Sequence, residues 1–319
     1  MRLRLAADFL HAGFEPGPPA RARTSGFGYV RLLPVVTSLA WVTTAQARGH
    51  DVDEPIALQA LARAGLAVEV VDWDDPAADW GRFDRVVLRS AWDYPDRMDE
   101  FLQWLDRVAA VTDLVNPPAT VRWSLDKRYL AELAEAGIPI TPTRFLAPGE
   151  AMEFPAGRFV VKPAVGAGGR DASCYAPDQL EQARSHIARL HAAGRVVLVQ
   201  PFLPSIAELG EWPMVFLGGR FSHSACKRVS LPQAGLVEGL FAAEENSAHA
   251  ASGEQVAVAQ AVLDHLSARL GTPAYARVDL VLGDDGRACV LEVELAEPSL
   301  FLPFAEPAGI EQLVSVLSR

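Results

Sequence analysis

The chain has 319 residues, half of them hydrophobic, and a net charge of −11 at pH 7. This length allows two or three compact lobes, and no apolar run is long enough to span a membrane. The acidic charge argues against non-specific nucleic-acid binding. The three cysteines (Cys174, Cys226 and Cys289) show neither metal-ligand spacing nor a paired framework. We therefore expect buried free thiols in a reducing cytoplasm.

Residues 1–33 combine Gly, Pro and Arg without a sustained period and lack the apolar core of a signal peptide. We expect a disordered extension there. Apolar runs then alternate with helical patterns across residues 34–118. Strands are predicted at 39–44, 66–73 and 85–90, with helices at 54–65 and 98–111. This βαβαβ order indicates a parallel, doubly wound, Rossmann-like sheet.

Ligands of such sheets lie beyond the carboxyl ends of the strands. No G-x-G-x-x-G accompanies them, which argues against a dinucleotide. Acids there can receive an ammonium, and an arginine can hold a carboxylate, so we expect a small zwitterion such as an amino acid or its derivative. The predicted substrate residues at these ends are Asp51, Glu54, Arg89, Asp93 and Tyr94.

A second lobe is expected over residues 119–203. Its first helix ends at Gly137 and is capped by Ser124 or Asp126, which places Lys127 in its first turn. A strand ending at Lys162 leads into a glycine-rich loop. Backbone N–H groups of such a loop can cover phosphates, although a plain flexible hairpin fits the pattern equally well.

A third lobe is expected over residues 204–319. It contains a strand pair bearing Lys227, a polar loop at 231–254, a helix at 256–271 and a closing helix at 306–319. Between these helices, strands 274–282 and 288–295 flank the turn Gly283-Asp284-Asp285-Gly286, which is typical of a hairpin.

This hairpin places Asp279, Glu292 and Glu294 on one face, where their charges should repel one another. We expect Leu291, Val293 and Leu295 to point to the other face. A hard cation such as Mg²⁺ would remove the repulsion. The alternative is a solvated sheet face with alternating acids. Arg277 shares the face and could simply pair with Glu292 or Glu294.

Lysine is rare in this chain. Of 29 basic residues only Lys127, Lys162 and Lys227 are lysines. A compact ammonium differs from a planar guanidinium, so these positions are candidates for a role that arginine cannot fill, although three lysines could also be retained by chance.

The ordered set DKRYL, VVKPAVGAGGRD, VQPFLPSI, CKRVS, RVDLVL and LEVELAEPS resembles the ATP-grasp ligases. The resemblance covers about residue 39 to the C-terminus. It is strongest to the branch that holds bacterial glutathione synthetase and the cyclo-ligase that forms cycloserine from O-ureidoserine. It implies an α/β fold with a Rossmann-like preATP-grasp domain (34–118), an α+β lid (119–203) and a C-terminal metal-binding subdomain (204–319).

The resemblance also implies site residues. Lys127 and Lys162 would contact ATP phosphates beneath a loop containing Gly166, Gly168 and Gly169. Gln200, Phe202 and Leu203 would frame adenine, with Glu211 or Glu208 on the ribose. Asp279, Glu292 and Glu294 would hold two Mg²⁺, or Mn²⁺ in their place. The predicted catalytic cations are Lys227, Arg228 and Arg277, and Arg277 would hold an acylphosphate intermediate unless it only pairs with an acid of the hairpin.

The implied activity is an ATP- and Mg²⁺-dependent carboxylate–amine or carboxylate–thiol ligase, or a cyclo-ligase, for a small amino-acid-type carboxylate. It would form an acylphosphate and release ADP and phosphate. The turn AEPS at 296–299 departs from glutathione synthetase, and Glu294 stands where the family often has Asn. Alternatives are a nucleotide-binding module without turnover and a metal-dependent hydrolase. No membrane or nucleic-acid partner is expected, and a homodimer is left open.

Overall fold

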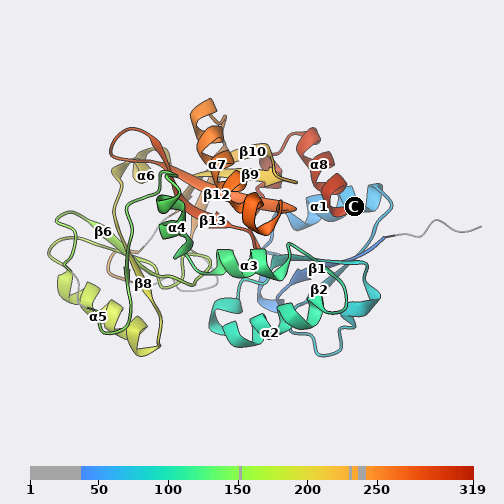
Figure 1. Ribbon diagram of the computed structural model, residues 1–319, viewed down its shortest axis with the longest axis horizontal. Coiled ribbons are helices and arrows are strands. Elements are labelled where there is room, and N and C mark those ends of the chain that lie inside the picture. The colour runs from blue at the N-terminus through green and yellow to red at the C-terminus, as the bar shows by residue number, and fades with distance from the viewer. Residues whose placement is uncertain (1–36, 151–152, 230–231, 236–241) are drawn as a thin grey trace, which may run out of the picture. The chain divides into compact units, whose positions relative to one another are not determined.

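The apolar runs that follow residue 37 form a four-stranded parallel sheet in the computed structural model shown in Figure 1. The structure describes residues 37–150, 153–229, 232–235 and 242–319, so the predicted extension at 1–33 lies outside the described residues. The sheet order is β2-β1-β3-β4, with β1 (Ser38–Thr43), β2 (Ala67–Asp72), β3 (Arg85–Ser90) and β4 (Asp113–Val115). The parallel α/β prediction is confirmed, and the three-residue strand β4 is an addition.

Successive side chains of each strand point to opposite faces of this sheet. Leu39 and Trp41 lie in a core with α1 (Glu54–Arg63) and α8 (Pro307–Leu317), whereas Ala40 and Val42 pack with α2 (Met98–Ala109). Helices on both faces bury the sheet, as parallel sheets require. Short 3-10 turns occur at η1 (Ala45–Ala47), η2 (Trp80–Arg82), η3 (Tyr94–Asp96) and η4 (Leu302–Phe304).

The helix expected between its cap at Ser124 or Asp126 and Gly137 is α4 (Tyr129–Glu135), and a separate helix that was not predicted, α3 (Pro118–Leu125), precedes it. The break arises because the Asp126 carboxylate accepts the backbone N–H of Arg128 at 3.0 Å, and a local bond of this kind competes with the helix. Ser124 donates instead to the Val121 carbonyl. Neither predicted cap is therefore formed, and Lys127 lies in the junction between the helices rather than in a first turn.

A second sheet, entirely antiparallel, has the order β5-β8-β6-β7. In Figure 1, α5 (Leu180–Ala192) lies along it, beside β6 and β8. The strand before the glycine loop and the strand after it do pair antiparallel, as predicted. The strands are β5 (Arg144–Leu146), β6 (Phe159–Pro163), β7 (Ser173–Tyr175) and β8 (Val197–Pro201).

The third sheet has the order β11-β10-β9-β12-β13 and contains the predicted hairpin. Its apolar face is covered by α7 (Gly253–Leu270), whose start is fixed by a capping box between Ser252 and Gln255. Part of the expected polar loop at 231–254 forms an exposed edge strand. The remaining elements are α6 (Pro204–Leu209), β9 (Trp212–Leu217), β10 (Arg220–Val229), β11 (Glu244–Ala248), β12 (Tyr275–Leu282) and β13 (Ala288–Glu294).

One buried hydroxyl joins the parallel sheet to the third sheet. Tyr275 Oη lies 2.7 Å from the Leu88 carbonyl and 2.8 Å from the Val115 carbonyl. Asn116 adds two side-chain bonds, to the carbonyls of Tyr275 and Leu295. The carboxyl ends of β3 and β4 are thereby held against the base of the acidic hairpin.

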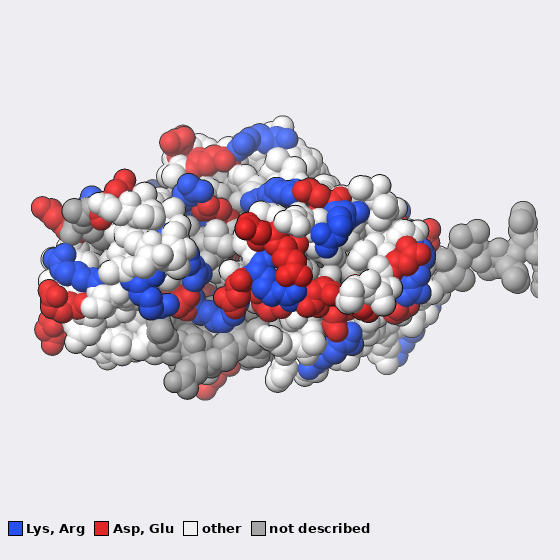
Figure 2. Space-filling model, turned by 90° about the horizontal axis from the view of Figure 1, so that it is seen from below, with Lys and Arg blue, Asp and Glu red and all other residues white. Residues whose placement is uncertain are grey.

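Several compositional expectations can be compared with the structure. All three cysteines are buried and free, as predicted. Among the described residues, none of the helices combines the length and hydrophobicity that a membrane-spanning segment needs. On the described part of the face in Figure 2, basic and acidic side chains are interleaved. That face offers no continuous basic surface for a polyanion.

Candidate functional site

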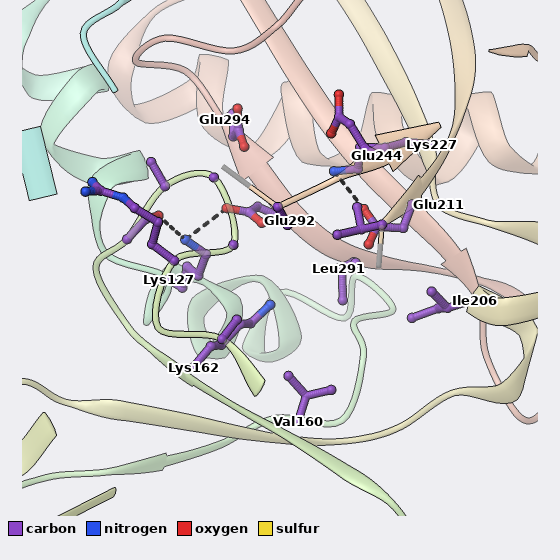
Figure 3. A pocket seen from close by; sticks show the side chains of 18 of the residues that line it. Lys127, Val160, Lys162, Ile206, Glu211, Lys227, Glu244, Leu291, Glu292 and Glu294 are labelled. Atoms are coloured by element: carbon purple, nitrogen blue, oxygen red, sulfur yellow. Dashed lines mark hydrogen bonds and ion pairs between the residues drawn. The ribbon is translucent and has the colours of Figure 1, made fainter. Parts of the chain in front are cut away.

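The acidic hairpin contains a bulge that changes which side chains share a face. Asp279 pairs with Glu292, but the next residue, Leu280, pairs with Val290. The extra residue, Leu291, therefore faces the same cavity as Glu292 (Figure 3). The prediction that Leu291 points away was wrong for this reason. The predicted face of Asp279, Glu292 and Glu294 is otherwise formed, with Val293 and Leu295 in the opposite core.

Cations of the protein itself neutralise these acids. Asp279 is 1% exposed and receives Arg277 Nε at 2.7 Å and Lys227 Nζ at 3.0 Å. Lys227 also pairs with Glu211 at 2.7 Å, and Arg277 with Glu294 at 2.7 Å. The ion-pair interpretation of Arg277 is thus correct for Glu294. It also extends to Asp279, which the sequence argument had not paired with it.

The electrostatics follow from this pairing. Burial disfavours the Asp279 carboxylate, but Arg277 and Lys227 outweigh burial and lower its pKa to about 2. Burial likewise opposes the Lys227 ammonium, yet Asp279 and Glu211 raise its pKa. Glu294 differs, because burial together with neighbouring acids raises its pKa despite Arg277. The repulsion expected among the acids is therefore concentrated at Glu294.

Among the described residues, no group of three or more Asp, Glu, His or Cys side chains is arranged so that it could hold a metal ion. The reason is the pairing above, since each predicted ligand carboxylate already faces an ammonium or a guanidinium. The donor set itself consists of hard oxygens, which suit Mg²⁺ and Mn²⁺. The metal role of Asp279, Glu292 and Glu294 stays a prediction.

Two of the three lysines enter the cavity from the side opposite the hairpin (Figure 3). Lys127 Nζ lies 2.9 Å from Glu292 Oε1 and 2.9 Å from the Gly166 carbonyl. Burial opposes its charge, but Glu292 and the neighbouring acids raise the pKa of Lys127. The Lys162 ammonium makes no hydrogen bond or ion pair with any residue of the described ranges, and burial lowers its pKa. Lys162 is therefore a cation without a close counter-ion.

The cavity between the second and third sheets has a volume of about 630 Å³. The predicted glycine loop forms part of its wall, through Gly166, Gly168 and Gly169. Arg170, which follows, donates to Asp96 at 2.5 Å and to the Trp92 carbonyl at 3.0 Å, so the loop is tied to the parallel sheet's η3 region.

One end of the cavity has an apolar wall. Val160, Ile206 and Leu291 line it (Figure 3), together with the predicted Gln200, Phe202 and Leu203. Gln200 donates its Nε2 to Thr143 at 2.8 Å, and the Arg158 guanidinium lies over the Phe202 ring at 4.1 Å. A flat aromatic ring of a ligand would fit between such surfaces.

The structure does not bring every predicted residue to the cavity. Glu208 is exposed outside it, whereas Glu211 lines it. Arg228 is exposed, because it follows Lys227 on β10 and so points to the other face. Neither Glu208 nor Arg228 contacts the cavity walls.

The predicted substrate residues also differ in how close they lie to the cavity. Tyr94 lines a small space that adjoins Lys127 and Glu292. Arg89 is 2% exposed and outside the cavity lining. Asp93 is buried and accepts Trp73 Nε1 at 2.8 Å. Asp51 and Glu54 lie at the start of α1 and do not line the cavity.

Sequence reasoning missed part of the lining. Glu297, Ser299 and Phe301 line the cavity beyond the hairpin. Glu297 is 5% exposed and follows Glu294 by three residues, so the run E-V-E-L-A-E contained a signal for it. His50 and Val52 contribute from the loop after β1.

The arrangement places cations opposite acids across one enclosed space. A phosphate chain could displace the carboxylates from Lys127 and Lys162, and the freed carboxylates could then accept divalent cations. This exchange would leave the charges of the site balanced.

Comparisons with known proteins identify relatives of this chain. Residues 39–116 match a family described as the N-terminal domain of D-cycloserine synthetase DcsG. The chain is 41% identical over 294 residues to the cycloserine biosynthesis protein DcsG of Streptomyces lavendulae, covering 88% of this chain and 98% of that protein.

Solved structures are similar as well. A crystal structure of D-cycloserine synthetase DcsG matches with a TM-score of 0.80 and 40% identity, covering 88% of this chain and 98% of the other. An ATP-grasp RimK domain protein of Sphaerobacter thermophilus matches with a TM-score of 0.58, covering 88% of this chain and 99% of the other. At 19% identity, the second match is evidence for the fold alone.

Proposed function

The chain belongs to the ATP-grasp ligases, in the family of the D-cycloserine synthetase, and on this premise we propose that it is a cyclo-ligase for a small amino-acid-type carboxylate. It is an ATP-dependent ligase with an ATP-grasp fold. The steps of the reaction and the identity of its substrate are our proposal.

The observation that carries the proposal is the pair of lysines facing the acidic hairpin across the cavity. Lys162 has no close counter-ion, and Lys127 is held by Glu292 at 2.9 Å. We propose that the phosphates of ATP take both ammonium groups beneath the glycine loop. Asp279, Glu292 and Glu294 then become available to Mg²⁺, which would neutralise the phosphate charge when bound.

The chemistry would run in two steps. The substrate carboxylate attacks the γ-phosphate of ATP, which forms an acylphosphate and releases ADP. A nitrogen of the same molecule then attacks the acyl carbon, closes a ring and expels phosphate. The protein contributes position and fixed positive charge rather than covalent help. Lys127, Lys162 and Arg277 supply that charge inside the cavity.

O-ureidoserine is the first substrate to test. Its nitrogen next to oxygen can reach the carboxyl carbon and close a five-membered ring. Cycloserine lacks the carbamoyl group of O-ureidoserine, so water must remove that group in the overall reaction. A substrate of this size fits beside Glu297 and Ser299, which follow the hairpin. We propose that Glu297, a buried carboxylate on the cavity wall, receives the substrate ammonium.

A nucleotide-binding module without turnover is the second candidate. One observation favours it, namely that each predicted metal ligand is already paired with a protein cation. If those pairs persisted with ATP bound, magnesium would have no carboxylate to bind.

The deciding experiment measures ADP release with Mg²⁺-ATP and either enantiomer of O-ureidoserine, with serine as a control that lacks the ring-closing nitrogen. We expect cycloserine only with O-ureidoserine, in an amount equal to the ADP released. Glu292→Gln should abolish both, whereas Glu135→Gln, an exposed acid on α4, should not. Tight ATP binding with no ADP from either enantiomer would favour the binding module.

A further inference from the structure

The segment that follows the acidic hairpin, residues 297–302, has two faces. Glu297, Ser299 and Phe301 line the cavity. Leu300 and Leu302, which alternate with them, lie in the core shared by the parallel sheet and α8. This cavity-wall segment is therefore an extension of the hairpin into the space where the proposed substrate lies.

Its backbone is held in an unusual conformation. Phe301 has a φ of +52°, a left-handed geometry that residues other than glycine seldom adopt. The two amides on either side of Phe301 are both bound by one carboxylate. Leu300 N–H donates to Asp53 Oδ2 at 2.5 Å and Leu302 N–H donates to Asp53 Oδ1 at 2.7 Å.

A buried arginine completes this support. Arg89 Nη2 donates to the Pro298 carbonyl at 2.6 Å and lies 3.6 Å from Asp53 Oδ2. Its guanidinium lies 5.4 Å from the ring centres of both Trp41 and Tyr275. Asp53 and Arg89 are both buried, and neither lines the cavity.

Among the described residues, Asp53 and Arg89 bind the segment through its backbone, at residues 298, 300 and 302. Fixing these three positions fixes the direction of the side chains between them, Ser299 and Phe301. Gln200 and Phe202, which form the apolar wall, are not among the described residues that Asp53 and Arg89 bind by hydrogen bond or ion pair. The pair can therefore affect one end of the cavity without the other.

We propose that Asp53 and Arg89 are positioning residues that hold the 297–302 segment as the substrate-side wall and so determine the affinity for the amino-acid substrate, not for ATP. This inference rests on the proposed function for the identity of the substrate. It also replaces the sequence-based expectation that Arg89 binds the substrate carboxylate directly.

The test compares Asp53→Asn, Arg89→Met and Arg89→Lys with the wild-type chain. We expect the first two to raise the KM for O-ureidoserine about ten- to a hundredfold, with the KM for ATP changed by less than about twofold. Arg89→Lys keeps a charge and a donor for the Pro298 carbonyl, so it should recover part of the loss. Arg85→Met is the matched control, because Arg85 on the same strand also pairs with an acid and donates to a backbone carbonyl, that of Val316.

A second readout does not depend on turnover. Hydrogen exchange of the Leu300 and Leu302 amides should accelerate about tenfold or more in Asp53→Asn and stay unchanged in Arg85→Met. Unaltered exchange in Asp53→Asn would overturn the inference, as would an equal rise of both KM values. If the wild-type chain released no ADP with O-ureidoserine, the proposed function would fail, whereas the exchange result would still decide whether the pair holds the wall.

Discussion

Lys162 and Lys127 should respond in opposite ways when each is replaced by methionine. Lys162 has no close counter-ion and burial lowers its pKa, so its charge opposes folding in the absence of nucleotide. Methionine keeps the length of the side chain without the charge. We expect Lys162→Met to stabilise the nucleotide-free protein by about 1 kcal/mol or more.

Lys127→Met should destabilise it. Lys127 is the partner of Glu292 at 2.9 Å, and its removal leaves a carboxylate that is only 21% exposed. Breaking a buried pair costs about 3–5 kcal/mol. The low end, about 3 kcal/mol, applies here because Glu292 retains some contact with water and lies near Lys162.

Both variants should nevertheless bind ATP less tightly. Each loses a charge-assisted hydrogen bond to phosphate, worth about 1.5–3 kcal/mol, which corresponds to roughly ten- to a hundredfold in Kd. Urea-unfolding midpoints without nucleotide and calorimetric titration with a non-hydrolysable ATP analogue measure the two effects. Arg144→Met, an exposed cation on the same sheet, is the control and should change neither. A Lys162→Met protein that is less stable than wild type, or that binds the analogue equally well, would refute the reasoning.

Three further predictions concern other contacts. Arg269 and His265 outweigh burial and lower the pKa of Glu132 from its ordinary value of 4.5 to about 2. The interactions that lower this pKa stabilise the folded protein above pH 4.5, and their contribution is lost as the pH falls towards 2. Glu132→Gln should therefore lower the free energy of unfolding by about 1–2 kcal/mol at pH 7, after allowance for solvent screening, and leave it unchanged near pH 2, as measured by urea titrations. Asp279→Asn should lower the unfolding midpoint as well as activity, because two buried cations lose their partner, and an unchanged midpoint would show that these ion pairs do not stabilise the fold. Arg170→Ala should raise the KM for ATP by about two- to fivefold in steady-state assays, since the glycine loop loses its ties at Asp96, and an unchanged KM would count against a closing role.

Local sequence signals were sufficient for the elements and for much of the site. The alternation of apolar residues and the Gly283–Gly286 turn each act over a few positions, so they can be recognised along the chain. The three lysines, the glycine loop and the acids of the hairpin were found in this way. All three lysines line one cavity together with Glu292 and Glu294, whereas Asp279 is buried behind them.

The pairing of charges could be decided only by the tertiary structure. The bulge opposite Asp279 turns Leu291 into the cavity, and a shift of one residue in strand register has no signal in composition. Arg89 illustrates the same limit. Its place at the end of β3 indicated a ligand contact, but Asp53 and the Pro298 carbonyl reach it from segments 36 and 209 residues away in the chain. A side chain's partner depends on which distant segments fold against it. The sequence alone therefore determined which charged groups the protein has near its site, and only the folded chain determined which of them meet.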